Sequence, residues 1–182
     1  MHQYLIILTI ATILLLISIY NEQKTLLAKN IGKLLLYRYI HLFFWIYLSF
    51  FALLFKPNDK INVTIYLSLA LIIMLHWEVF GCCLLSLVEL NNYSLLKSAD
   101  NYKQSYHPSL YTIFYKYTDI IVLLLGLIMS IGIYYVLFNA KFIELKYKIL
   151  LGLVFTSLFM KTLLSRDNAN YDKNILKMFE RV

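Results

Sequence analysis

The residue types that could support chemistry gather in one stretch, from Leu75 to Glu89, which reads L-H-W-E-V-F-G-C-C-L-L-S-L-V-E. Histidine, cysteine and carboxylate side chains can bind metal ions, transfer protons or act as nucleophiles. Serine and tryptophan in the same stretch can add hydrogen bonds. We group these side chains as a candidate polar hub, which consists of His76, Trp77, Glu78, Cys82, Cys83, Ser86 and Glu89.

Two metal-based interpretations of the hub meet a geometric obstacle if the stretch is one helix. A bis-histidine haem would use His41 and His76, which the helical rise separates by about 10 Å in depth. A zinc or copper site would combine His76 with Glu78, Cys82 and Cys83. His76 and Cys83, however, would lie about 10 Å apart along the helix. We therefore expect no cofactor and no metal.

Two further kinds of chemistry are open to the same stretch. A cysteine nucleophile at Cys82 or Cys83 would need a base and an oxyanion hole, and no pattern in the sequence marks either. Glu78 and Glu89 could instead line a path for protons or ions. The simplest expectation is that the hub hydrogen-bonds helices to one another, because polar side chains fix helix register inside membranes. We therefore expect no catalytic residue and no enzymatic activity.

A helical projection of the stretch predicts polar groups on both sides of one helix. Glu78, Cys82, Ser86 and Glu89 fall within about 80° of arc, and His76 and Cys83 project to the opposite side. An ionisable group in the membrane interior costs roughly 2.5–3.5 kcal/mol, so such groups are normally paired. The hub is therefore expected at the centre of a helix bundle.

Candidate interhelix partners for the hub come from the preceding apolar segment. Arg38 should lie at a depth similar to that of Glu89, because the two segments run antiparallel, and an Arg38–Glu89 pair is expected. His41 should lie about as deep as residues 82–86. Glu78 is deeper and has no evident cationic partner, so we expect it to be protonated or hydrogen-bonded to a Tyr or Ser.

Composition places these residues in a membrane protein. Of the 182 residues 61% are hydrophobic and 15% are charged, with only five Gly and two Pro, whereas a soluble domain is about 45–50% apolar. We expect a single integral membrane domain over residues 1–182. The net charge of +7 is explained by loops that face anionic headgroups, and no basic run with interleaved aromatics indicates nucleic-acid binding.

The apolar segments predict an all-α, polytopic transmembrane helix bundle with about five spans, because about 20 apolar residues cross the hydrocarbon core. The predicted spans are residues 4–20, 34–55, 63–90, 118–138 and 149–165. The last is the weakest, because Lys161 interrupts it. Gly126-x-x-x-Ser130 and Gly152-x-x-x-Thr156 offer small faces for close helix approach.

The remaining segments predict the topology. Residues 91–117 are expected to form a tyrosine-rich interfacial loop, with a helix break at His107-Pro108, and residues 166–182 a charged cytosolic tail. With five spans, five of the 17 basic residues share the N-terminal side: Lys56, Lys60, Lys141, Lys146 and Lys148. The other twelve face the opposite side. The positive-inside rule then predicts an N-terminus that is outside or lumenal and a cytosolic C-terminus.

Residues 76–89 also carry a family resemblance, in the pattern H-W-x5-C-x-L-S-x-x-E. It resembles a motif of small multi-pass membrane proteins of nucleocytoplasmic large DNA viruses. A C-x-L-T-x-x-E variant is similar to a pattern in short bacterial membrane proteins of unknown function. The viral resemblance implies a component of a virion inner membrane, beneath a capsid, and implies no catalytic role.

Three interpretations of function therefore stand side by side. The first is a structural or assembly role in a membrane, including a virion membrane. The second is an accessory membrane subunit of a respiratory complex in the mitochondrial inner membrane, since five-span chains of this size occur there. The third is a small ion or proton transporter that uses Glu78. The expected partners are the lipid bilayer and other proteins of a larger assembly, with no nucleic acid and no small-molecule substrate.

Overall fold

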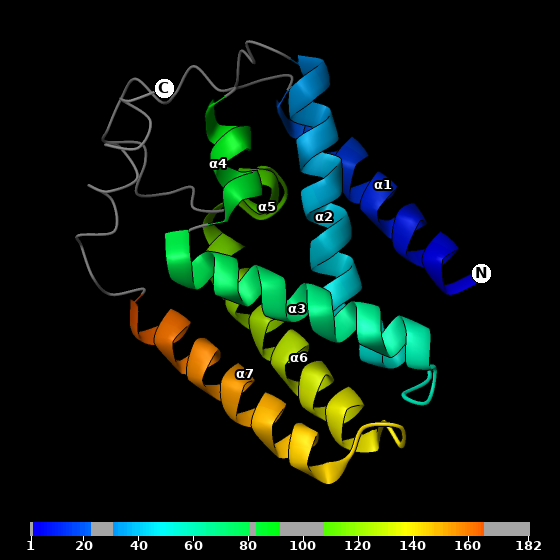
Figure 1. The fold of residues 1–182 in the computed structure, drawn as a ribbon. Coiled ribbons are helices and arrows are strands. Elements are labelled where there is room, and N and C mark those ends of the chain that lie inside the picture. The colour runs from blue at the N-terminus through cyan, green and yellow to red at the C-terminus, as the bar shows by residue number, and fades with distance from the viewer. Residues whose placement is uncertain (1, 23–30, 81–82, 92–107, 166–182) are drawn as a thin grey trace.

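A computed structural model describes residues 2–22, 31–80, 83–91 and 108–165 (Figure 1). Every regular element within these residues is helical, which confirms the all-α class. The elements are α1 (His2–Glu22), α2 (Ile31–Leu54), α3 (Lys60–Phe80), α4 (Leu84–Asn91), α5 (Pro108–Phe114), the 3-10 helix η3 (Tyr115–Tyr117), α6 (Thr118–Asn139) and α7 (Leu145–Ser165).

Four of the described helices are long and apolar enough to cross a membrane. The segments are His2–Asn21, Gly32–Leu54, Lys60–Val79 and Ile120–Asn139. Helix α7 is as long as α1 and α3, at 21 residues, but it carries Lys146, Lys148 and Lys161. Four candidate spans together with α7 are consistent with an integral membrane protein of about five spans.

The predicted single span over residues 63–90 is wrong. Helix α3 ends at Phe80 and α4 begins at Leu84, and Gly81 and Cys82 lie outside the described residues. Glycine is a poor helix former, which favours a helix end at this point. Figure 1 shows α4 leaving the line of α3 and lying beside α2 and α5, with which it is in contact. The helical projection therefore does not hold beyond Phe80.

Part of the predicted loop over residues 91–117 is also helical. Asn91 ends α4, and residues 108–117 form α5 and η3. Pro108 begins a helix there, because the missing N–H of proline has no partner to lose in the first turn. Ser109, Leu110 and Thr112 are buried, so α5 is an interior element. Residues 92–107 and the tail 166–182 lie outside the described residues, and those parts of the prediction stay predictions.

Helix α2 is the central element of the fold. It is in contact with α1, α3, α4, α5 and α6, whereas α7 contacts α3 and α6. Figure 1 shows α1 on one side of α2 and α4 with α5 on the other, while α3, α6 and α7 form a second group. The N-terminal half of α2 thus faces α1, α4 and α5, which are the elements that carry the candidate site.

The C-terminal half of α2 builds an aromatic core, which consists of Tyr4, Tyr47, Phe51, Phe55 and Tyr66. Phe51 is fully buried and stacks on Tyr66 of α3, with ring centroids 4.1 Å apart, and on Phe55 at 4.5 Å. The Tyr66 hydroxyl donates to the Leu48 carbonyl oxygen at 3.2 Å. Among the described residues, stacked rings fill this end of the bundle without any buried charge.

Small residues allow close helix approach at two places along α6 and α7. A Cβ added to Gly132 would lie 3.2 Å from the Tyr66 hydroxyl oxygen and 3.4 Å from Cβ of Ala52. The Gly152 carbonyl oxygen accepts a hydrogen bond from Tyr134 of α6 at 3.2 Å. Gly126, in contrast, has open space where its side chain would be. Of the two predicted small faces, the one at Gly152 meets a neighbouring helix, whereas Gly126 of the other has open space beside it.

Candidate functional site

A fully buried ion pair links α2 to α4. Arg38 Nε lies 2.6 Å from Glu89 Oε1, and neither side chain is exposed. Arg38 Nη1 donates a second hydrogen bond to Ser18 Oγ of α1 at 2.8 Å. The two residues that the sequence pairs by depth are therefore in contact. Removing one partner of such a buried pair typically costs about 3–5 kcal/mol, because the other charge is left unpaired.

The imidazole of His41 has polar groups at both ring nitrogens. Its Nδ1 lies 2.9 Å from Ser109 Oγ and 3.7 Å from Glu89 Oε2. Its Nε2 accepts a hydrogen bond from Trp45 Nε1 at 3.1 Å and lies 3.5 Å from Cys83 Sγ. Because the indole N–H can only donate, this arrangement assigns the neutral tautomer with its proton on Nδ1.

Hydroxyl groups extend these contacts to α1 and α5. Ser18 Oγ lies 2.6 Å from Thr112 Oγ1, and Thr112 donates to the Ser109 carbonyl oxygen at 2.9 Å. Asn21 Nδ2 donates to the Thr112 carbonyl oxygen at 2.9 Å. We call the connected set the polar network; its members are Ser18, Arg38, His41, Cys83, Glu89, Ser109 and Thr112. It joins α1, α2, α4 and α5 through side chains that, apart from Cys83, are buried.

Two buried oxygen atoms at the network keep hydrogen-bonding capacity. Glu89 Oε2 and Ser86 Oγ have no hydrogen-bond partner among the described residues, although Glu89 is fully buried and Ser86 is 2% exposed. A buried polar atom without a partner carries a free-energy cost of about 1–3 kcal/mol. Such atoms are therefore places where a further group could bind or a charge could develop.

Cys83 lies directly before α4 and is partly exposed. Its sulfur lies near the backbone N–H groups of Leu85 and Ser86, at the N-terminus of α4. With His41 on its other side, the thiol is flanked by groups that stabilise a thiolate. The continuous-helix projection placed Cys83 opposite Glu89, and the helix break brings both residues to the same imidazole.

Glu78 has a cationic partner that the sequence does not reveal. Its carboxylate forms an ion pair with Lys161 of α7, whose side chain is 64% exposed, while that of Glu78 is 19% exposed. This contact ties α3 to α7, and it lies on other elements than the polar network. The expected protonation or Tyr or Ser hydrogen bond is not needed to explain a carboxylate that has a lysine beside it.

The other predicted hub residues lie apart from the network. Trp77 packs against Trp45, with ring centroids 6.2 Å apart, in an apolar cluster with Leu42 and Leu110. Its Nε1 is buried with no hydrogen-bond partner among the described residues. His76 is half-buried on α3, and Cys82 lies outside the described residues. Of the predicted hub residues that the structure describes, the network includes Cys83 and Glu89, with Ser86 beside them.

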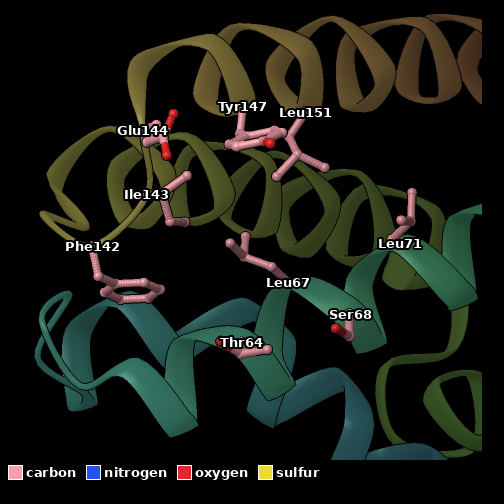
Figure 2. Close-up of a pocket in the computed structure, with 9 residues that line it drawn as sticks. All are labelled: Thr64, Leu67, Ser68, Leu71, Phe142, Ile143, Glu144, Tyr147 and Leu151. Carbon is pink, nitrogen blue, oxygen red and sulfur yellow. The ribbon is translucent and has the colours of Figure 1, made fainter.

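Metal-binding groups and surface grooves are the other places where a ligand could bind to the described residues. No group of three or more His, Cys, Asp or Glu side chains in residues 2–22, 31–80, 83–91 and 108–165 is placed to hold a metal ion. An open groove of about 350 Å³ lies between α3 and the start of α7, and Figure 2 shows the side chains that line it, none of which belongs to the polar network. Its lining is mostly apolar and consists of Thr64, Leu67, Ser68, Leu71, Phe142, Ile143, Glu144, Tyr147 and Leu151.

Comparison of the chain with protein-family models, with curated proteins and with solved structures gives no significant match.

Proposed function

We propose that this integral membrane protein has a structural or assembly role within a larger membrane complex. The observation that carries the proposal is the Arg38–Glu89 pair, in which both charges are fully buried and 2.6 Å apart. A transport path needs ionisable groups that exchange partners or meet water. These two groups hold α2 and α4 together and are shielded from solvent, which suits a rigid component.

The outer surface supports the same proposal. Large apolar side chains are exposed on the outer helices of the bundle; examples are Leu5 and Leu16 of α1, Ile131 of α6 and Leu153 of α7, which are 59–69% exposed. Lipid tails cover such residues in a bilayer, and helices of partner proteins can pack against them with little polar cost. The partners proposed are therefore lipid and other membrane proteins.

The main reason to propose transport was a carboxylate without a partner, and the structure gives Glu78 a partner. Glu78 was a candidate for ion movement because it had no partner, and the ion pair with Lys161 supplies one. A partly exposed pair of this kind typically contributes about 0–1 kcal/mol and needs no transport role to explain it. Flux of protons or cations into proteoliposomes that collapsed on Glu78→Gln would reinstate the transporter.

The proposed orientation has the N-terminus outside or lumenal and the C-terminus cytosolic, with α7 as the fifth membrane segment. The excess of basic residues on the C-terminal side supports it. Epitope tags at the two ends should differ in accessibility to antibody in cells whose plasma membrane alone is permeabilised. Equal accessibility of both tags would place α7 on the membrane surface and leave four spans.

Purification in a mild detergent tests the assembly role. We expect the protein to elute with stoichiometric partner proteins, at a mass well above its own 21.5 kDa. Virion structural proteins among the partners would support the viral membrane, and oxidoreductase subunits would support the respiratory alternative. Recovery as a lone monomer, with a bound metal or haem, would overturn the structural role.

A further inference from the structure

We propose that Cys83 is a nucleophile, activated by His41, that accepts a long-chain acyl group from an acyl thioester. The proposal concerns a covalent modification site and is independent of the assembly role. It starts from a juxtaposition that the helix break creates: Cys83 Sγ lies 3.5 Å from His41 Nε2, although the residues are 42 positions apart. A thiol beside an imidazole is the arrangement that generates reactive thiolates.

The hydrogen bonds of His41 set it up as a base. Trp45 donates to Nε2, so this nitrogen is the unprotonated one, and Cys83 Sγ lies 3.5 Å from it and competes with the indole for the same lone pair. Nδ1 faces Ser109 Oγ at 2.9 Å, which holds the ring orientation. A nucleophile, a base and a group that orients the base are the three parts of a thiol or serine nucleophile site.

Glu89 supplies the counter-charge for the protonated base. Its Oε2 is fully buried, has no hydrogen-bond partner among the described residues and lies 3.7 Å from His41 Nδ1. Its Oε1 is already bound by Arg38. When His41 takes the thiol proton, the imidazolium meets this free carboxylate oxygen, and the ion pair that forms stabilises the thiolate.

The residues after Cys83 provide groups for the acyl carbonyl. Backbone N–H groups of Leu85 and Ser86 lie near the sulfur, in the first turn of α4. The Ser86 hydroxyl, one helical turn from Cys83, is buried without a hydrogen-bond partner among the described residues. These donors can stabilise negative charge that develops on the carbonyl oxygen next to the sulfur.

Buried apolar side chains lie on the inner side of the dyad, and the partly exposed Cys83 is the side open to an acyl donor. Trp45, which contacts His41, belongs to an apolar cluster with Leu42 and Leu110, against which Trp77 packs. Cys83 itself is partly exposed. It follows the candidate span of α3, which ends at Val79. Acyl thioesters partition to membrane surfaces, and cysteines beside spanning helices are the usual positions of S-acylation.

The reaction balances without an additional reagent. His41 Nε2 gives up the hydrogen bond from Trp45 and takes the proton from Cys83, and the thiolate attacks the carbonyl carbon of the acyl thioester. A new S–C bond to Cys83 forms, and the bond between the acyl carbon and the carrier sulfur breaks. The proton on His41 passes to the departing carrier thiolate, so the products are S-acylated Cys83 and the free carrier thiol. The chain attached adds about 0.8 kcal/mol of membrane affinity per buried CH₂ group.

The test uses the full-length protein in detergent micelles with an alkyne-tagged palmitoyl-coenzyme A. We expect labelling that hydroxylamine removes, that Cys83→Ser reduces to background and that the matched control Cys82→Ser leaves unchanged. His41→Gln should slow labelling by roughly 100-fold at neutral pH, the contribution typical of a general base. The labelling rate of the His41→Gln variant should then rise with pH up to about 8.5, as the unassisted thiol of Cys83 ionises.

Each alternative outcome overturns a stated part of the proposal. No hydroxylamine-sensitive labelling of the wild type, or labelling confined to Cys82, would exclude Cys83 as an acyl acceptor. Labelling of His41→Gln at the wild-type rate would exclude His41 as the base. If His41→Gln aggregates in gel filtration, the comparison of Cys83→Ser with Cys82→Ser still decides the acceptor.

Discussion

The two halves of α2 are buried by different physical means. In the N-terminal half, Arg38 and His41 are surrounded by Glu89, Ser109 and Ser18, which are polar groups from α1, α4 and α5. The C-terminal half buries stacked aromatic rings against α3, with Phe51 and Tyr66 at 4.1 Å. One helix therefore carries a polar network at one end and an aromatic core at the other.

The difference shows how specificity and packing are divided along the helix. Stacked rings gain energy from contact area and tolerate small shifts, because dispersion forces are weakly directional. An arginine can satisfy a buried carboxylate only within a narrow range of distances and angles. The polar half therefore fixes which elements meet α2 and in which register, and the aromatic half contributes packing.

The largest effect is expected when the network loses its arginine. Arg38→Leu leaves Glu89 buried without its counter-charge and should lower the free energy of unfolding by about 3–5 kcal/mol. Arg38→Lys keeps the charge but cannot reach both Glu89 and Ser18 in the same geometry, so its loss should be smaller. Thermal unfolding in detergent, followed by fluorescence gel filtration, measures both. Equal stability of Arg38→Leu and wild type would show that the pair does not hold the fold.

A comparable loss is expected in the aromatic half. Phe51→Ala removes a fully buried ring and should destabilise the protein by about 3–5 kcal/mol, because the cavity is enclosed by Tyr47, Phe55 and Tyr66. The same thermal assay applies. The two halves of α2 should differ in whether an apolar substitution can restore stability. Phe51→Leu, which refills much of the volume, should recover part of the stability that Phe51→Ala loses. No apolar residue at position 38 should restore stability while Glu89 is present.

A glycine pair offers a matched test of packing along α6. Gly132→Ala places a methyl group 3.2 Å from the Tyr66 hydroxyl oxygen, and the overpacking should cost about 1–3 kcal/mol. Gly126→Ala, in the same helix, meets open space and should be neutral or slightly stabilising, because alanine favours the helix. Melting temperatures of the two variants side by side give the comparison. A larger loss at Gly126 than at Gly132 would contradict the packing described here.

The smallest effect is expected at the Glu78–Lys161 pair. Lys161 is 64% exposed, so solvent screens its charge, and Lys161→Met should change the free energy of unfolding by at most about 1 kcal/mol. The change should shrink further when salt is added. A loss as large as that of Arg38→Leu would mean that this pair, too, is shielded from water in the membrane.

The sequence predicts the Arg38–Glu89 contact because two antiparallel segments with a known direction fix relative depth. It predicts the all-α class because apolar runs of spanning length permit little else. It predicts that His41 lies about as deep as residues 82–86, but it does not predict the contact between Cys83 and His41, since a projection drawn through Gly81 assumes that the helix continues. The glycine was the available signal, and it was too weak to outweigh 28 consecutive residues with spanning character.

The remaining contacts depend on tertiary placement that no local pattern encodes. Ser18 and Thr112 are single hydroxyl residues in apolar helices, and nothing in their spacing marks them as partners of Arg38. Lys161 meets Glu78 only because α7 packs against α3, which a list of spans does not establish. Ser109 lies in a helix that begins at Pro108, where a break was expected.

A double-mutant cycle between Arg38 and Glu89 tests most directly whether the buried pair organises the bundle. The free energy of unfolding is measured in detergent for the wild type, Arg38→Leu, Glu89→Leu and the double variant. We expect the double variant to be more stable than either single variant, so the coupling energy should exceed one single loss, about 3–5 kcal/mol. Losses that add to within about 0.5 kcal/mol would show that the two residues are not partners in the folded protein.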